Sequence, residues 1–109
     1  MRQAEVYRNG TLAGVLSQYP DKHYEFRYTD EWFQNSALPA ISLTLPKTQQ
    51  VYQSSYLFPF FFNMLSEGVN RQLQTRQLRI DEKDYFGLLL ATAGADTIGA
   101  VTVKPLASF

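Results

Sequence analysis

Hydrophobic and polar residues alternate with a period of two over much of the first half of the chain, which is typical of half-buried β-strands. Apolar-rich segments within Glu5–Leu16 flank Asn9-Gly10, a dipeptide that favours a type I′ hairpin turn. His23–Tyr28 alternates strictly, and Ile41–Leu45 repeats the pattern before Pro46 ends it. The pattern therefore predicts an opening β-hairpin followed by a third and a fourth strand.

The period of the apolar positions changes towards 3.6 in the second half, which indicates helices. We expect a short helix over Pro59–Leu65, because proline suits a first helical turn, and a second helix over Val69–Arg79. A third helix should begin with Asp81 as its N-cap and end at Gly94. Its body is apolar on nearly every side, so it should be the buried central helix. A final alternation within 101–103 predicts a last strand.

These elements together predict an α+β fold. A small antiparallel sheet of about five strands, opened by the β-hairpin, should pack with about three helices from the second half of the chain. The length of 109 residues suits one domain, and 45% hydrophobic residues are enough for a packed core, so we expect a single domain over 1–109.

Charge and composition exclude several functions. Ten Lys and Arg balance ten Asp and Glu, which argues against a strongly basic surface for nucleic acid. Cysteine is absent, which removes thiolate metal sites and cysteine nucleophiles. The beginning of the sequence lacks the apolar stretch of a signal peptide, and no run is apolar enough to span a membrane, so we expect a cytoplasmic protein with no membrane contact.

Residues that could support catalysis or bind a metal are few. His23 is the only histidine of the sequence. Any site that needs a second histidine, whether to pair with a serine or to hold a metal ion, is therefore excluded by count. We expect His23 to face solvent from its strand. Asp81, Glu82 and Asp84 form an acidic cluster, but helix capping explains it more simply than a metal site. No glycine-rich phosphate loop is present. We therefore expect no catalytic residue, no metal and no cofactor, and a small enzyme is the weakest alternative.

Two features keep a small nucleic-acid-binding module open as an alternative. The second expected helix has a mildly basic face, formed by Arg71, Arg76 and Arg79. The third strand carries an aromatic stripe that could stack on bases, formed by Tyr24, Phe26 and Tyr28. Core packing explains the stripe more simply, because no basic groove accompanies it in the sequence.

The aromatic-rich segment 56–65 favours a protein partner. A helix of two turns cannot turn every one of its rings inward, so some should be exposed. Phe and Met are enriched in protein interfaces, so an exposed part of this segment would suit an anchor patch. A well-buried helix in an aromatic core is the simpler interpretation, and both can hold at once.

Five segments, taken in their order and spacing, resemble a known family. They are Val6-Tyr7-Arg8-Asn9-Gly10 with Ala13-Gly14; Phe26 to Trp32; Ala40-Ile41-Ser42-Leu43-Thr44-Leu45-Pro46; Pro59-Phe60-Phe61-Phe62-Asn63-Met64-Leu65-Ser66-Glu67-Gly68; and Phe86-Gly87-Leu88-Leu89 through Gly94-Ala95-Asp96-Thr97-Ile98-Gly99-Ala100-Val101. Across nearly the whole chain they resemble the N-terminal subdomain that precedes the kinase core in HipA-type serine/threonine kinase toxins. The kinases usually carry proline where this chain has Ser66.

The resemblance implies a function without catalysis. The lobe that holds the ATP-binding and catalytic residues of the kinases is missing from this sequence, which in that respect resembles the small HipS-type antitoxins of three-gene HipBST modules. Such a protein would bind and inhibit a HipT-like serine/threonine kinase toxin, with a HipB-like helix-turn-helix DNA-binding protein as a further partner in a ternary complex. A purely structural kinase subdomain is the other alternative.

The same resemblance suggests where the partner would bind. We take Phe61, Met64 and Leu65 as the apolar anchors of the kinase interface, with Ser66 and Glu67 at the end of the helix reaching polar groups of the kinase. An alanine at Met64 or Leu65 would then weaken binding without unfolding the domain.

Overall fold

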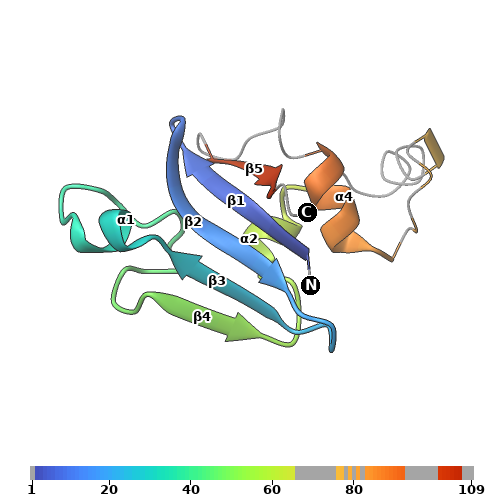
Figure 1. Ribbon diagram of the computed structural model, residues 1–109, viewed down its shortest axis with the longest axis horizontal. Helices are drawn as coiled ribbons and strands as arrows, with labels where there is room; N and C mark the ends of the chain where they lie inside the picture. Colours follow the sequence, from blue (N-terminus) through green and yellow to red (C-terminus); the bar gives the residue numbers. More distant parts are fainter. Residues whose placement is uncertain are drawn as a thin grey trace.

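The computed structural model describes residues 2–65, 76, 77, 79, 81, 83–92 and 101–106. Its centre is a five-stranded antiparallel sheet in the order β4-β3-β2-β1-β5 (Figure 1). The strands are β1 (Arg2–Arg8), β2 (Thr11–Gln18), β3 (Tyr24–Tyr28), β4 (Val51–Ser54) and β5 (Val101–Pro105). The helices are α1 (Asp30–Gln34), α2 (Pro59–Phe62) and α4 (Tyr85–Thr92). The predicted α+β class and five-stranded sheet are confirmed, although α1 lies in the first half of the chain.

The opening hairpin forms as predicted. Asn9 and Gly10 join β1 to β2 with φ angles of 51° and 80°, the positive values that a type I′ turn requires. Val6 pairs with Gly14 and Tyr7 with Leu12, so Ala13, which lies between Leu12 and Gly14 on β2, is the extra residue of a β-bulge. Its carbonyl accepts a hydrogen bond at 2.9 Å from the N–H of Thr29, which caps α1. The bulge thus fixes the start of a helix that the hydrophobic pattern did not predict.

One face of the sheet packs on α2 and α4. The alternating residues Tyr24, Phe26 and Tyr28 are buried on this face, so the aromatic stripe of β3 is core and cannot stack on bases. The ring of Phe26 lies 5.8 Å from that of Phe61 in α2, and the ring of Tyr24 lies 6.1 Å from that of Phe86 in α4. Phe86 and the two leucines that follow Gly87 are buried, which confirms the third expected helix as a core element.

The strand predicted over Ile41–Leu45 is wrong. This segment is a turn in the loop between α1 and β4, and the fourth strand is formed instead by Val51–Ser54, ten positions later. Ile41 and Leu45 are buried as the alternation implied, but Leu43, which the same alternation places inward, is exposed. The backbone groups of Ile41 and Leu45 bond the hydroxyl of Tyr28 instead of a neighbouring strand. A loop held over the core therefore shows the same hydrophobic pattern as a strand.

The helices expected in the second half are partly described. α2 is shorter than predicted, because regular helix ends at Phe62 and 63–65 form turns. α4 begins at Tyr85. The sequence predicts Asp81 as the residue that caps this helix, but the side chain that accepts a hydrogen bond from the first turn is that of Asp84, from the N–H of Gly87 at 3.1 Å. Of the helix expected over Val69–Arg79 only 76, 77 and 79 are described, and the expected end at Gly94 lies outside the described residues.

Candidate functional site

The structure buries the three expected apolar anchors. Phe61, Met64 and Leu65 all belong to the hydrophobic core, so their burial argues against them as anchors, and their partner-binding role stays a prediction. Phe61 of α2 packs edge-on against Phe58 and at a tilt against Phe26 of β3, and Met64 and Leu65 are buried in the turns that follow the helix. Ser66 and Glu67 lie outside the described residues.

The same segment does leave other aromatic side chains partly open. Phe60 and Phe62 are half-buried, and the side chain of Tyr56 is 79% exposed. Phe60 packs against the ring of Phe61 at 5.2 Å, and Phe62 packs against Tyr85 of α4 at 5.1 Å. The expectation that this segment cannot hide all its rings is therefore confirmed, and the rings left partly open are those of Tyr56, Phe60 and Phe62.

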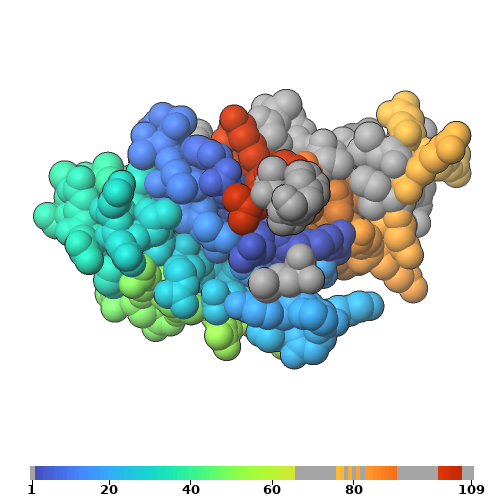
Figure 2. All heavy atoms as spheres, in the orientation of Figure 1, coloured from blue at the N-terminus to red at the C-terminus, as the bar shows by residue number. Residues whose placement is uncertain are grey.

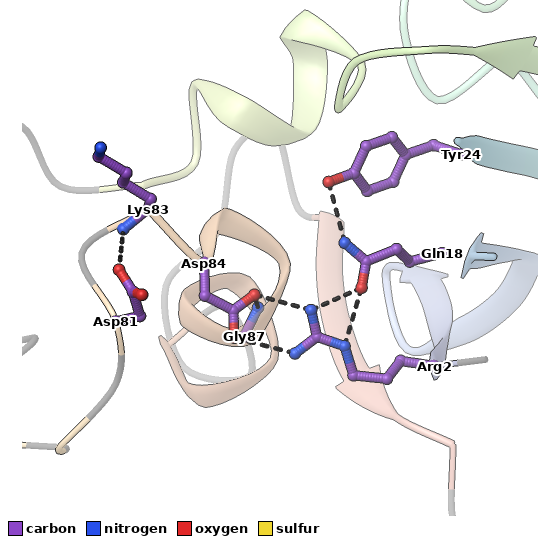
Figure 3. Close-up of polar contacts among 7 residues, drawn as sticks. All are labelled: Arg2, Gln18, Tyr24, Asp81, Lys83, Asp84 and Gly87. Atoms are coloured by element: carbon purple, nitrogen blue, oxygen red, sulfur yellow. Dashed lines mark hydrogen bonds and ion pairs between the residues drawn. The ribbon is translucent and has the colours of Figure 1, made fainter. Parts of the chain in front are cut away.

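A polar cluster joins the beginning of β1 to the beginning of α4 (Figure 3). The guanidinium of Arg2 forms a bidentate ion pair with the carboxylate of Asp84, with N–O distances of 2.7 and 3.0 Å. It also donates twice to the side-chain oxygen of Gln18, whose amide donates to the hydroxyl of Tyr24 at 3.1 Å. Gly87 leaves room for this arrangement, because a Cβ there would collide with the Asp84 carboxylate.

The ion pair determines the protonation of both partners. The hydrogen bond to Asp84 raises the pKa of Arg2 above its usual value, although partial burial acts in the opposite direction. The hydrogen bond from Arg2, helped by the N–H of Gly87, lowers the pKa of Asp84. The Arg2 guanidinium also lies 5.2 Å from the centre of the Phe86 ring. Both groups therefore stay charged and paired at neutral pH, which suits a structural clamp better than an acid–base catalyst.

A cleft of about 440 Å³ opens beside this cluster. Its charged lining residues are Arg2, Lys22, Lys83, Asp81 and Asp84, so cations and carboxylates are mixed. The carboxylate of Asp81 accepts a hydrogen bond at 2.8 Å from the N–H of Lys83 within its own turn. The cleft can accept polar groups, and the described residues that line it include no serine, cysteine, threonine or histidine.

His23 lies at the start of β3, where it is half-exposed as expected. Its ring stacks on Tyr19 with 4.4 Å between ring centres, and its Nδ1 contacts the carboxylate of Asp21. The hydrogen bonds from His23 lower the pKa of Asp21. Within the described part of the chain, no group of three His, Cys, Asp or Glu residues is placed to hold a metal ion. No helix there is long and apolar enough to cross a membrane.

The face of the sheet that points away from α2 is polar. Strands β1, β2 and β3 lie side by side in the space-filling view (Figure 2). Outward side chains on this face pair with one another: the hydroxyl of Tyr7 donates to Glu5 at 3.1 Å, and the ammonium of Lys104 lies 5.2 Å from the Tyr7 ring. This face therefore carries no large apolar patch over the described strands.

The comparisons with known proteins agree with this fold. Residues 4–104 match the family described as HipA N-terminal domain. The structure is similar to a solved structure titled N-terminal domain of HipA toxin, with a TM-score of 0.74 and 26% sequence identity, covering 100% of this chain and 96% of that one.

Two sequence relatives differ in length. An uncharacterized protein of Haemophilus influenzae is 30% identical over 104 residues, which make up 95% of this chain and 92% of that protein. A Sinorhizobium fredii protein named "Putative kinase Y4mE" is 27% identical over 107 residues, or 96% of this chain, but the match spans only 25% of that protein. The same domain therefore makes up almost all of one relative and a quarter of another.

Proposed function

Because the chain belongs to the family of HipA N-terminal domains, we propose that it is an antitoxin, a non-catalytic protein that binds and inhibits a HipT-like serine/threonine kinase toxin. The observation that carries the proposal is the pair of relatives of different length. The domain is a quarter of a protein named as a kinase and nearly all of another protein. A domain that rests on a kinase lobe in one chain has a surface suited to recognise such a lobe from a separate chain.

The described residues support binding over chemistry. Three of the charged side chains at the cleft are engaged within the fold: Arg2 and Asp84 pair with each other, and Asp81 accepts a hydrogen bond within its own turn. The only histidine of the sequence is stacked on Tyr19 and contacts a neighbouring carboxylate. Titratable groups that converge on a pocket with perturbed pKa values are the usual mark of an active site, and here the perturbed groups serve the fold.

The mechanism is steric. A free antitoxin would dock where the fused domain rests on the kinase and hold the enzyme unproductive or block the path of its substrate. A fused domain has a local concentration in about the millimolar range, so a separate chain needs a real interface, typically near 1,600 Å² in total. A HipB-like DNA-binding protein would complete a ternary complex. We place the complex in the cytoplasm, where a kinase toxin finds ATP.

Co-expression tests the proposal directly. The test uses a HipT-like kinase that lacks this domain, which the resemblance predicts in a neighbouring reading frame. This kinase is expressed with and without the chain, and growth is scored. We expect growth arrest by the kinase alone, rescue by the chain, and co-purification of the two. A kinase that arrests growth equally in the presence of the chain would overturn the antitoxin role. Stable association without rescue would indicate a purely structural subdomain instead.

A further inference from the structure

The loop between α1 and β4 is unusually long. It occupies all of the chain from Asn35 to Gln50 and contains no helix or strand. Loops longer than about 12–15 residues without secondary structure are uncommon, and most are either binding loops or disordered segments. The distinction between these two kinds depends on whether the loop is held in place.

Side chains of the regular elements hold this loop to the core. The hydroxyl of Tyr28 in β3 accepts a hydrogen bond from the N–H of Ile41 at 3.1 Å and donates to the carbonyl of Leu45 at 2.5 Å. The indole N–H of Trp32 in α1 donates to the carbonyl of Pro39 at 2.9 Å. The loop is therefore ordered on both sides of the turn between Ile41 and Leu45.

Further bonds close the base of the loop. The ammonium of Lys47 donates to the carbonyls of Asn35 and Leu38 at 2.7 and 2.8 Å. The hydroxyl of Tyr52 in β4 donates to the carbonyl of Pro46 at 2.6 Å. Because the backbone of the loop is fixed by these bonds, ordering it on binding a partner costs little further conformational entropy.

Leu43 lies at the tip of this fixed loop with its side chain 99% exposed. The N–H of Leu45 donates to the carbonyl of Ser42 at 3.1 Å, which closes a tight turn around Leu43. The hydroxyls of Ser42 and Thr44 bond each other at 2.9 Å across the base of the turn. With Ile41 and Leu45 buried on either side, the backbone forces the leucine between them outward.

We propose that this turn, Ser42–Leu45, is a docking element that inserts Leu43 into an apolar socket on the kinase lobe. The inference rests on the proposed function and names the surface that performs it. The segment 36–46 carries no charged residue, so the complementary surface is uncharged and apolar. The two hydroxyls beside Leu43 suit the polar rim that surrounds an apolar anchor in an interface. The kinase is the occupant that fits best, because the Sinorhizobium relative holds this domain within a much longer chain named as a kinase.

A titration with matched variants tests the docking element. Purified chain is titrated by calorimetry into a HipT-like kinase that lacks this domain. We expect Leu43→Ser to weaken binding by at least about tenfold, which is about 1.4 kcal/mol, and Leu43→Met to retain most of the affinity. Tyr56→Ser removes the other large exposed hydrophobic side chain among the described residues, 79% exposed and outside the loop, and should change affinity less than about twofold. All variants should melt at the temperature of the unchanged chain.

The outcomes separate the two proposals. If the unchanged chain does not bind the kinase, both the antitoxin role and the docking element are overturned. If it binds and Leu43→Ser binds equally well, the antitoxin role stands and the docking element is overturned. If light scattering shows a dimer of the chain that Leu43→Ser dissociates, the socket lies on a second copy of the chain and the kinase assignment is wrong.

Discussion

The hydroxyl of Tyr28 donates a hydrogen bond at 2.5 Å to the carbonyl oxygen of Leu45, which lies 17 positions further along the chain. The same hydroxyl accepts from the N–H of Ile41, so one side chain satisfies two buried backbone groups of the loop. Burial raises the pKa of Tyr28, which keeps the phenol protonated as a donor. The Tyr28 hydroxyl thus ties both sides of the turn between Ile41 and Leu45 to the core of the sheet.

Removing that hydroxyl should loosen the loop. Tyr28→Phe leaves the buried N–H of Ile41 and the carbonyl of Leu45 without their partner, and an unsatisfied buried group costs about 1–3 kcal/mol. We expect a fall of that size in the free energy of unfolding, measured by urea denaturation. Tyr52→Phe is the matched control, because its part-buried hydroxyl bonds only the carbonyl of Pro46 and should cost less. Equal stability of the two variants would contradict the role assigned to Tyr28.

The strands that could be predicted are those whose local pattern decides their structure. The Asn9-Gly10 turn supplies its own positive φ angles, and β3 alternates strictly over an aromatic stripe, so both follow from neighbouring residues. The segment Ile41–Leu45 alternates equally well. What makes it a loop is the hydroxyl of Tyr28 from a distant strand, and no local pattern contains that information.

The site was harder to predict for a related reason. The composition of the aromatic segment indicates that some rings are exposed, but only the packing of Phe61 on Phe26 decides which ones. The clamp between Arg2 and Asp84 joins positions 82 apart, and although Asp84 belongs to the acidic cluster of the sequence, nothing there pairs it with Arg2. Leu43 shares the alternating pattern of its buried neighbours, so its exposure appears only in the structure.

Truncating Phe61 should destabilise the domain instead of only weakening a complex. The ring is fully buried and packs against Phe26 and Phe58, and replacing a buried phenylalanine by alanine costs about 3–5 kcal/mol. We expect Phe61→Ala to lower the melting temperature by more than Phe60→Ala, whose ring is half-buried in the same helix. If Phe61→Ala keeps the melting temperature and loses only kinase binding, the side chain is an anchor and its place in the core is wrong.

Gly14 is required by the close approach of β2 to β3. A Cβ at this position would lie 2.6 Å from both the carbonyl oxygen of Arg27 and a ring carbon of Phe26. The carbonyl belongs to a paired strand and cannot move easily, so Gly14→Ala should cost at least about 1–3 kcal/mol of stability, the usual penalty for overpacking a core. Gly10→Ala is the control, because space is open there and only its φ of 80° is unfavourable, which costs about 1–2 kcal/mol. Scanning calorimetry should place the melting temperature of Gly14→Ala below that of Gly10→Ala, and the reverse order would contradict the packing described.

The clamp between Arg2 and Asp84 should make stability depend on pH in a predictable direction. The pKa of Asp84 is lowered in the folded protein by its bonds to Arg2 and Gly87, so its contribution is complete above the unfolded value of about 3.9 and is lost as the pH falls through the folded pKa. Asp84→Asn removes the charge but keeps an oxygen that can accept from Gly87. Because the two side chains are 41% and 32% exposed, solvent screening limits the expected loss at pH 7 to about 0.5–1 kcal/mol.

The measurement for this variant is the difference in the free energy of unfolding from the unchanged chain, followed by urea denaturation from pH 7 down to pH 2. The difference should be largest at neutral pH and should close as Asp84 becomes protonated in the unchanged chain, since the side chain at position 84 is then neutral in both proteins. Asp81→Asn is the control. The carboxylate of Asp81 accepts a hydrogen bond from the N–H of Lys83, and an asparagine oxygen can accept the same bond. We therefore expect the free energy of unfolding of this variant to change little at any pH. A loss for Asp84→Asn that stays constant down to pH 2 would mean that packing, and not the ion pair, joins β1 to α4.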